Sequence, residues 1–252
     1  MSALESPNRE LTLEGSANFR DLGGLETRDG QVVRSATLFR SDALAYLTAA
    51  DLDLLGAIGI ASMIDLRTAD ELERYGLSPL REHGVRHIHL PLIERTGDPA
   101  DFNRDLTLSD FYVRILEHAG DRVRRIFETL AEPSNLPSVV HCTGGKDRTG
   151  IAVALVLRLL NVPDAMIVAD YAMTDRNMAR LVESRRAAGQ PISHVNVPEH
   201  FMRAVPETME YFLVTLDNRW GSIHGYLDAI EIDVAVRDAV RSNLLAPAQA
   251  GT

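Results

Sequence analysis

The sequence has little of several features that mark special classes of protein. Its 252 residues include one cysteine, Cys142, so no disulfide can form within the chain. The lack of internal disulfides is typical of a reducing compartment, and we expect a cytoplasmic protein. The first residues, MSALESPNRELTLEG, have no basic stretch followed by an apolar one, which predicts no cleaved secretory signal. Secretion by another route stays open.

Positive charge and long apolar runs are also scarce. The 36 acidic residues outnumber the 26 Lys and Arg residues, and the net charge is −10. Nucleic-acid binding needs a basic surface, so nucleic acid is not an expected partner. The longest apolar run, residues 151–157, is far shorter than the roughly 20 residues of a transmembrane helix, so no stable membrane insertion is expected. These features leave the oligomeric state open.

The pattern of apolar residues predicts one α/β domain over residues 1–252. Strand-like segments at 60–66, 85–92 and 138–141 alternate with helical ones, as in a central sheet flanked by helices. Two of the helices are expected to begin at the capping-box sequences TAAD and TADE, which start at Thr48 and Thr68.

The two ends of the chain differ from this alternation. Residues 1–15 are polar and are expected to be loosely held. Residues 164–245 are nearly all helical in pattern, and no strand is expected after Pro163. These helices either pack against the sheet or form a C-terminal lid or cap over a site.

The segment around Cys142, HCTGGKDRTG at residues 141–150, lies between an expected strand and an apolar helix. A loop that enters a helix N-terminus presents unpaired N–H groups and a favourable dipole to an anion. Glycines let several of these groups converge, and the planar fork of Arg148 can hold two phosphate oxygens. The phosphate-binding candidates are Thr143, Gly144, Gly145, Lys146 and Thr149.

The same positive field favours a thiolate at Cys142 near neutral pH. We therefore expect the sulfur to attack phosphorus and form a phosphocysteine, which water hydrolyses while Arg148 and the loop amides stabilise the oxygens. The Thr149 hydroxyl is a candidate hydrogen-bond donor to the sulfur, and His141 is expected to orient the loop from behind. Other kinds of site fit less well: Asp147 and Val140 occupy positions that a Walker A loop reserves for Ser or Thr and for Gly. A thiolate metal site lacks partner cysteines, and His83, His87 and His89 are more easily explained as structural.

These residues resemble the Cys-x5-Arg protein tyrosine phosphatase superfamily, and in particular its bacterial branch. The resemblance covers about residues 15–245 through the motifs NFRDLGG from Asn18, FRSD from Phe39, IDLR from Ile64, ADY from Ala169 and WGS from Trp220. It implies a phosphatase-type α/β fold with a helical lid. It also implies activity on phosphotyrosine proteins, extending to phosphoserine, phosphothreonine and phosphoinositides, without a metal or cofactor.

The general acid departs from the family pattern. Related enzymes carry an Asp three residues after a Pro in the loop that follows the second strand, and here that position is Glu94. Asp147, inside the Cys142 loop, is the rival, and we favour it over Glu94; Asp98 and Asp101 lie further along the same stretch as Glu94. Asp65 is expected to be structural, paired either with Arg67 or with a neighbouring loop.

Two further questions stay open from the sequence. Lys146 either attracts extra phosphates, as a lysine here does in lipid phosphatases of the superfamily, or merely balances the charge of Asp147. Because the acid is in an unusual position, an alternative function also stays open, namely that of a phospho-binding module with little turnover.

Overall fold

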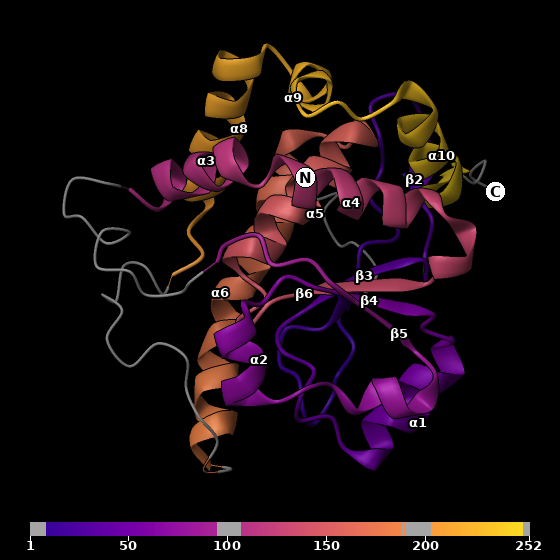
Figure 1. The fold of residues 1–252 in the computed structure, drawn as a ribbon, viewed down its shortest axis with the longest axis vertical. Coiled ribbons are helices and arrows are strands. Elements are labelled where there is room, and N and C mark those ends of the chain that lie inside the picture. The colour runs from indigo at the N-terminus through magenta and orange to yellow at the C-terminus, as the bar shows by residue number, and fades with distance from the viewer. Residues whose placement is uncertain (1–8, 95–106, 188, 190–202, 249–252) are drawn as a thin grey trace, which may run out of the picture.

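The centre of the fold is a sheet with helices on both faces, seen in a computed structural model that describes residues 9–94, 107–187, 189 and 203–248 (Figure 1). The five strands lie in the order β1 (Arg20–Asp21), β3 (Leu38–Ser41), β6 (Ser138–His141), β4 (Ser62–Asp65) and β5 (Arg86–His89). Strands β3, β6, β4 and β5 are parallel, and β1 runs antiparallel to β3 at one edge. The predicted α/β class is confirmed.

The register brings the carboxyl ends of the middle strands level with one another. Ser41, the last residue of β3, and Asp65, the last residue of β4, both lie opposite His141, the last residue of β6. In sheets of this kind ligands bind outside the carboxyl ends of the strands. The loops that follow these three strands therefore meet at the edge where a site is expected.

Helices cover each face of the sheet. The first face carries α1 (Ala49–Ile58) and the 3-10 helix η1 (Pro79–His83). The opposite face carries α3 (Leu108–His118), α4 (Gly120–Ala131), α5 (Asp147–Leu159), α6 (Asp164–Ala187), α8 (Pro206–Trp220), α9 (Ile223–Ala229) and α10 (Val234–Leu244). Helix α2 (Ala69–Tyr75) follows β4, and the short η3 (Pro133–Asn135) precedes β6.

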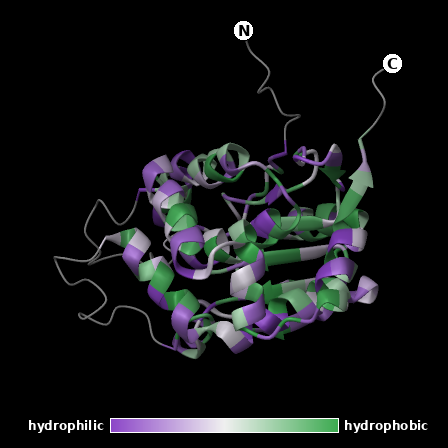
Figure 2. Cartoon of the chain, turned by 90° about the horizontal axis from the view of Figure 1, so that it is seen from above, coloured by the Kyte–Doolittle hydropathy of each residue, from purple (hydrophilic) through white to green (hydrophobic). Residues whose placement is uncertain are grey.

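Two large apolar clusters, separated by the sheet, form most of the core of the described residues, and a small third one holds Ala17, Met178 and Leu181. Val139 belongs to the cluster beneath α1, whereas its neighbour Val140 belongs to the cluster beneath α5. Met63 and Ile64 on β4 divide in the same way because successive side chains of a strand point to opposite faces. Figure 2 shows the hydrophobic strands enclosed between the helical layers.

Most of the predicted elements are present. Thr48 and Thr68 each cap a helix through a capping box, as predicted, because the side chain of each accepts from the backbone of the third helical residue. One prediction was wrong: a strand does follow Pro163. β7 (Leu245–Pro247) pairs antiparallel with β2 (Gln31–Val33). A strand of three residues is too short to show a periodic pattern, and its partner is distant in the sequence.

The two ends of the chain are held more firmly than expected where they are described. Residues 1–8 lie outside the described residues, but Arg9 and Leu13 are buried, so the segment from Arg9 onward is not loose. Helices α8 and α10 pack on α3 and α4 and contribute Phe212 and Val240 to the core, as packing helices do. The lid prediction also involves residues 188 and 190–202, which lie outside the described residues.

Within the described part of the chain, no helix is both long enough and apolar enough to cross a membrane.

Candidate active site

The Cys142 loop lies at the carboxyl edge of the sheet, where β6 ends and α5 begins at Asp147. Gly145 has a φ of 68°, and a Cβ there would lie 2.5 Å from the carbonyl oxygen of Ser41, so this position requires glycine. The Asn18 side-chain amide donates to the carbonyls of Gly144 and Gly145, at 3.2 and 3.3 Å. Arg40 also donates to the Gly145 carbonyl, at 2.8 Å. Because these carbonyls are held by Asn18 and Arg40, they point away from the centre of the loop, and the loop amides are left to converge on an anion.

Arg148 is fixed by a carboxylate from α2. Its two terminal nitrogens donate to the two oxygens of Glu71, at 2.5 and 2.8 Å, in a paired geometry that sets the plane of the guanidinium. Glu71 also accepts from the hydroxyl of Thr143 and from the backbone N–H of Thr68. Burial opposes the charge of Glu71, but Arg148 outweighs it and lowers the pKa of Glu71 to about 2.

This role of Glu71 was not predicted from the sequence. The capping-box spacing identified Glu71 as the residue that caps α2, and the structure shows that it does so. The spacing says nothing of the bonds that both carboxylate oxygens make with Arg148, which lies 77 residues away in the sequence.

Asp147 is the candidate acid that the structure joins to the loop. It is the first residue of α5, and its Oδ1 accepts from the hydroxyl of Tyr112 at 2.6 Å. The ammonium group of Lys146 lies 3.4 Å from the same oxygen. Lys146 also donates to the carbonyl of Arg203 at 3.4 Å, so it is held beside Asp147 in a buried position.

Glu94 has a different environment. Its side chain is 83% exposed and forms an ion pair with Arg122 of α4 at 3.3 Å. An exposed pair of this kind is weak and is screened by salt. Asp98 and Asp101 lie outside the described residues.

Cys142 and Thr149 are both buried, and Cys142 is only 2% exposed. The Thr149 hydroxyl makes no hydrogen bond with any residue that the structure describes, so the expected bond to the sulfur is not formed here. A buried hydroxyl without a partner is rare, and a group that develops charge beside it would supply one.

Comparison with known proteins decides the family. The sequence profile described as the tyrosine phosphatase family matches residues 11–246. The chain belongs to this family. Among its relatives, a putative tyrosine-protein phosphatase of Cupriavidus necator is 31% identical over 242 residues, which are 90% of this chain and 86% of the relative. The triple specificity protein phosphatase PtpB of Mycobacterium tuberculosis is 29% identical over 278 residues, covering 92% and 98% of the two chains. A tyrosine-protein phosphatase of Nostoc commune is 35% identical over 140 residues, covering 54% and 47%.

This phosphatase supports its loop with a second buried charge cluster. Asp170 of α6 forms ion pairs with Arg9, Arg20 and Arg40, at 3.0, 3.1 and 2.6 Å. Burial and the neighbouring Arg40 lower the pKa of Arg20 to about 10, which shows how crowded the positive charge is. Because Arg40 also donates to the Gly145 carbonyl, this cluster connects β1, β3 and α6 to the Cys142 loop.

Beneath the loop of the phosphatase lies a third group of charges, around Asp65. Arg67 donates to both oxygens of Asp65, which confirms the predicted structural pair. The ring of His87 lies 3.1 Å from Asp65, and that of His141 lies 3.7 Å from it. Burial lowers the pKa of His141 to about 4, so this histidine is neutral under the loop, consistent with a role in orientation. His89, which shares a strand face with His87, contacts the Arg67 carbonyl at 2.8 Å.

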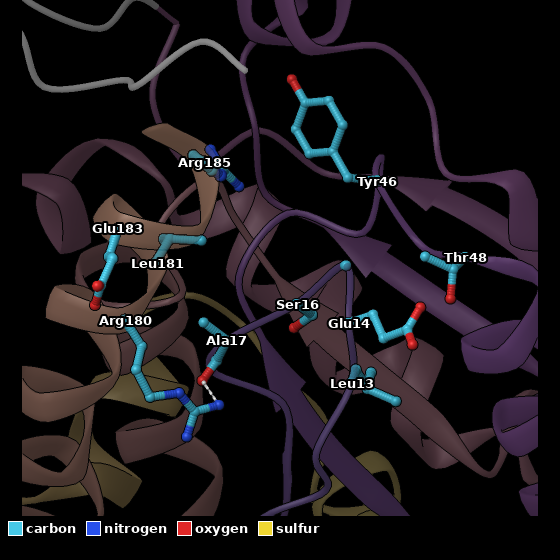
Figure 3. A pocket seen from close by; sticks show the side chains of 11 residues that line it. Leu13, Glu14, Ser16, Ala17, Tyr46, Thr48, Arg180, Leu181, Glu183 and Arg185 are labelled. Carbon is cyan, nitrogen blue, oxygen red and sulfur yellow. Dashed lines mark hydrogen bonds between the residues drawn. The ribbon is translucent and has the colours of Figure 1, made fainter. Parts of the chain in front are cut away.

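This phosphatase has a cavity of about 450 Å³ between α6 and the segment 13–17 (Figure 3). Arg180 and Arg185 of α6 form one side of it, and Tyr46 lies on another. The guanidinium of Arg185 is stacked 5.3 Å from the Tyr46 ring and lies 3.7 Å from the buried Asp42. Asp42 in turn accepts from the backbone N–H of Asn18, the residue that holds the Cys142 loop.

Proposed function

We propose that this tyrosine phosphatase hydrolyses phosphotyrosine residues with Cys142 as nucleophile, Arg148 as phosphate ligand and Asp147 as general acid. The observation that carries the proposal is the paired hydrogen bonding of Arg148 to Glu71, which holds the guanidinium plane beside the loop that contains Cys142. Glu71 and the Leu66 carbonyl take both hydrogens of Nη1 and one of Nη2. The Nε–H and the other Nη2–H then form a fixed fork that matches two oxygens of a phosphate and needs little rearrangement on binding.

In the first step the Cys142 thiolate attacks phosphorus as the bond from phosphorus to the tyrosine oxygen breaks. The leaving oxygen takes the proton of Asp147, so that neutral tyrosine departs and the enzyme carries a phosphocysteine. In the second step water attacks the same phosphorus and gives a proton to Asp147. The thiolate leaves, and inorganic phosphate is released.

The environments of the two candidate acids support Asp147. Its carboxylate is held by the buried Tyr112 and by Lys146 in the first turn of α5, five residues after the nucleophile. Glu94 is largely exposed and pairs with Arg122, so nothing described orients it toward the loop. A general acid must lie within hydrogen-bond reach of the oxygen that it protonates.

Substrate range is part of the proposal. The name of the PtpB relative describes a triple specificity phosphatase, which supports hydrolysis of phosphoserine and phosphothreonine as well. Phosphoinositide hydrolysis stays a prediction from Lys146, whose contacts with Asp147 and the Arg203 carbonyl favour a role in balancing Asp147.

The experiment compares Asp147→Asn with Glu94→Gln on two substrates. Tyrosine is a poor leaving group that needs a proton, whereas p-nitrophenol leaves readily without one. We expect Asp147→Asn to lower kcat/KM on a phosphotyrosine peptide by about 100-fold or more, and to cost much less on p-nitrophenyl phosphate. The kcat/KM of Glu94→Gln should stay within about twofold of the wild-type value on both substrates. A large loss confined to Glu94→Gln would reverse the assignment.

A Cys142→Ser variant serves as the reference for the nucleophile. Serine is isosteric but a far weaker nucleophile, so turnover should fall to the background rate on both substrates. Turnover equal to that of the wild type would refute the phosphocysteine pathway. Tight binding of a phosphotyrosine peptide by the wild type, with no product released, would instead support a phospho-binding module.

A further inference from the structure

Two buried tyrosines form a chain of hydroxyl groups that ends on Asp147. The Tyr112 hydroxyl of α3 lies 2.6 Å from Asp147 Oδ1 and 2.8 Å from the hydroxyl of Tyr171, which belongs to α6. Because a hydroxyl has one hydrogen and Tyr112 gives its own to Asp147, Tyr171 must donate to Tyr112. Tyr112 is 0% exposed and Tyr171 is 1% exposed. The chain therefore runs from Tyr171 through Tyr112 to the carboxylate.

The rings that carry these hydroxyls are fixed by packing. Tyr112 stands edge-on to Tyr171 and to Phe212 of α8, with centroids 6.4 and 5.8 Å apart. Three helices thus hold the ring of Tyr112 against the first turn of α5. Contacts between the rings do not depend on the hydroxyl, so the hydroxyl can be removed while the packing is kept.

The hydroxyl chain acts on one oxygen of the carboxylate. Tyr112 and Lys146 both contact Oδ1 of Asp147. An oxygen that accepts two such contacts is the poorer place for a proton, so the acidic proton is favoured on Oδ2. Burial and the adjacent negative charge of Asp147 raise the pKa of Tyr112 well above its usual range, so Tyr112 stays a donor throughout catalysis.

We propose, resting on the assignment of Asp147 as the acid, that Tyr112 is a positioning residue for this carboxylate and that Tyr171 supports it. Tyr112 fixes Oδ1 so that Oδ2 carries the proton to the leaving oxygen and takes one back from water. It gives up no proton itself.

Other charges act on the same carboxylate. Lys146 lies beside it in the loop, and Arg148 follows it on α5. Arg40 of β3 and Asp175 of α6 act on the Tyr171 end of the chain, and Asp175 is itself paired with Arg203. All of these remain in a variant that lacks only one tyrosine hydroxyl, so the difference from the wild type isolates the hydroxyl.

The experiment measures the pH dependence of kcat/KM on a phosphotyrosine peptide for Tyr112→Phe, Tyr171→Phe and a control. Loss of a hydrogen bond to an ionised carboxylate should move the basic limb of Tyr112→Phe upward by about one pH unit. Tyr171→Phe should move it the same way by a smaller amount, because its hydroxyl acts through Tyr112. The control is Tyr226→Phe, whose buried hydroxyl donates to the Leu116 carbonyl instead and whose limb should not move.

Two further results separate the positioning role from the acid itself. When Asp147→Asn is already present, adding Tyr112→Phe should lower kcat/KM by less than about a further twofold, because the carboxylate that Tyr112 positions is gone. If the basic limb of Tyr112→Phe coincides with that of the wild type while Asp147→Asn abolishes the limb, the positioning role is refuted and the acid stands. If Asp147→Asn keeps the wild-type limb, the acid assignment itself fails. Should Tyr112→Phe not fold, Tyr171→Phe decides by the same shift: no movement of its limb refutes the chain.

Discussion

Two buried charge clusters meet at the Cys142 loop, and they are built differently. On the α2 side, one carboxylate, Glu71, faces one guanidinium, Arg148, in a paired geometry. On the α6 side, one carboxylate, Asp170, faces three guanidiniums, of which Arg20 and Arg40 are almost completely buried. The first cluster is balanced, whereas the second has an excess of positive charge.

The difference indicates that the two clusters have different roles. Glu71 orients Arg148, the cation that is expected to hold the substrate phosphate in a paired geometry, so its effect should appear mainly in catalysis. Asp170 is the counter-charge that lets three arginines remain buried, so its effect should appear mainly in stability. Both clusters reach the loop, through Thr143 in one case and through the Gly145 carbonyl in the other.

The largest expected effect breaks the second cluster. Asp170→Asn leaves three buried guanidiniums without their carboxylate, and removal of one partner of a buried ion pair costs about 3–5 kcal/mol. Urea unfolding should show this loss in full. The matched control is Asp175→Asn on the same helix, whose exposed pair with Arg203 should contribute less than about 1 kcal/mol. Equal losses for both variants would show that Asp170 has no special role.

The pH dependence of stability sharpens the comparison, because Glu71, Asp170 and His141 lose their contributions to the free energy of unfolding in different pH ranges. Burial lowers the pKa of His141 from its usual 6.5 to about 4. As the pH falls from 6.5 to 4.5, the unfolded chain binds a proton that the folded protein does not. Stability should therefore fall by about 2–3 kcal/mol in this range, and it is fully present above pH 6.5.

The measurement for His141 is the free energy of unfolding against pH. His141→Asn should flatten the slope between pH 6.5 and 4.5, whereas a matched change at the exposed His83 should leave it as in the wild type. Glu71 and Asp170 have pKa values far below their usual ranges, so their contributions are present above about pH 4.5 and are lost only at lower pH. An unchanged slope in His141→Asn would contradict the account.

A smaller effect is expected from Glu71→Gln. The amide cannot offer two charged acceptors, so the fork of Arg148 loses its fixed plane. We expect kcat/KM on a phosphotyrosine peptide to fall by about 10- to 100-fold. The loss of stability should be smaller than that of Asp170→Asn, because one buried guanidinium rather than three loses its carboxylate. Glu73→Gln, an exposed change on the same helix, is the control. A variant that loses stability but keeps full activity would show that Glu71 belongs with the structural cluster.

Local signals accounted for much of the fold and for the centre of the site. Periodicity predicted the central strands β4, β5 and β6, and the loop spacing identified Cys142 and Arg148, because both depend on residues that are neighbours in the sequence. The same holds for the pair of Asp65 with Arg67, which are two residues apart.

The remainder depends on contacts between distant segments. The pairing of β2 with β7 joins residues more than 200 positions apart. The motifs at Asn18, Phe39 and Ala169 were visible as a resemblance, but their physical role, holding the loop through Asp170 and its arginines, appears only in three dimensions. Tyr112 was not recognised because a buried tyrosine in an amphipathic helix is first read as core.

The most direct test of the site is to locate the covalent intermediate. The wild-type protein would be mixed with a phosphotyrosine peptide that carries radiolabelled phosphate, quenched with acid during the first turnover, digested and mapped. The account predicts label on the peptide that contains Cys142, and none in the Cys142→Ser variant. Label on another residue, or the same label in Cys142→Ser, would contradict it.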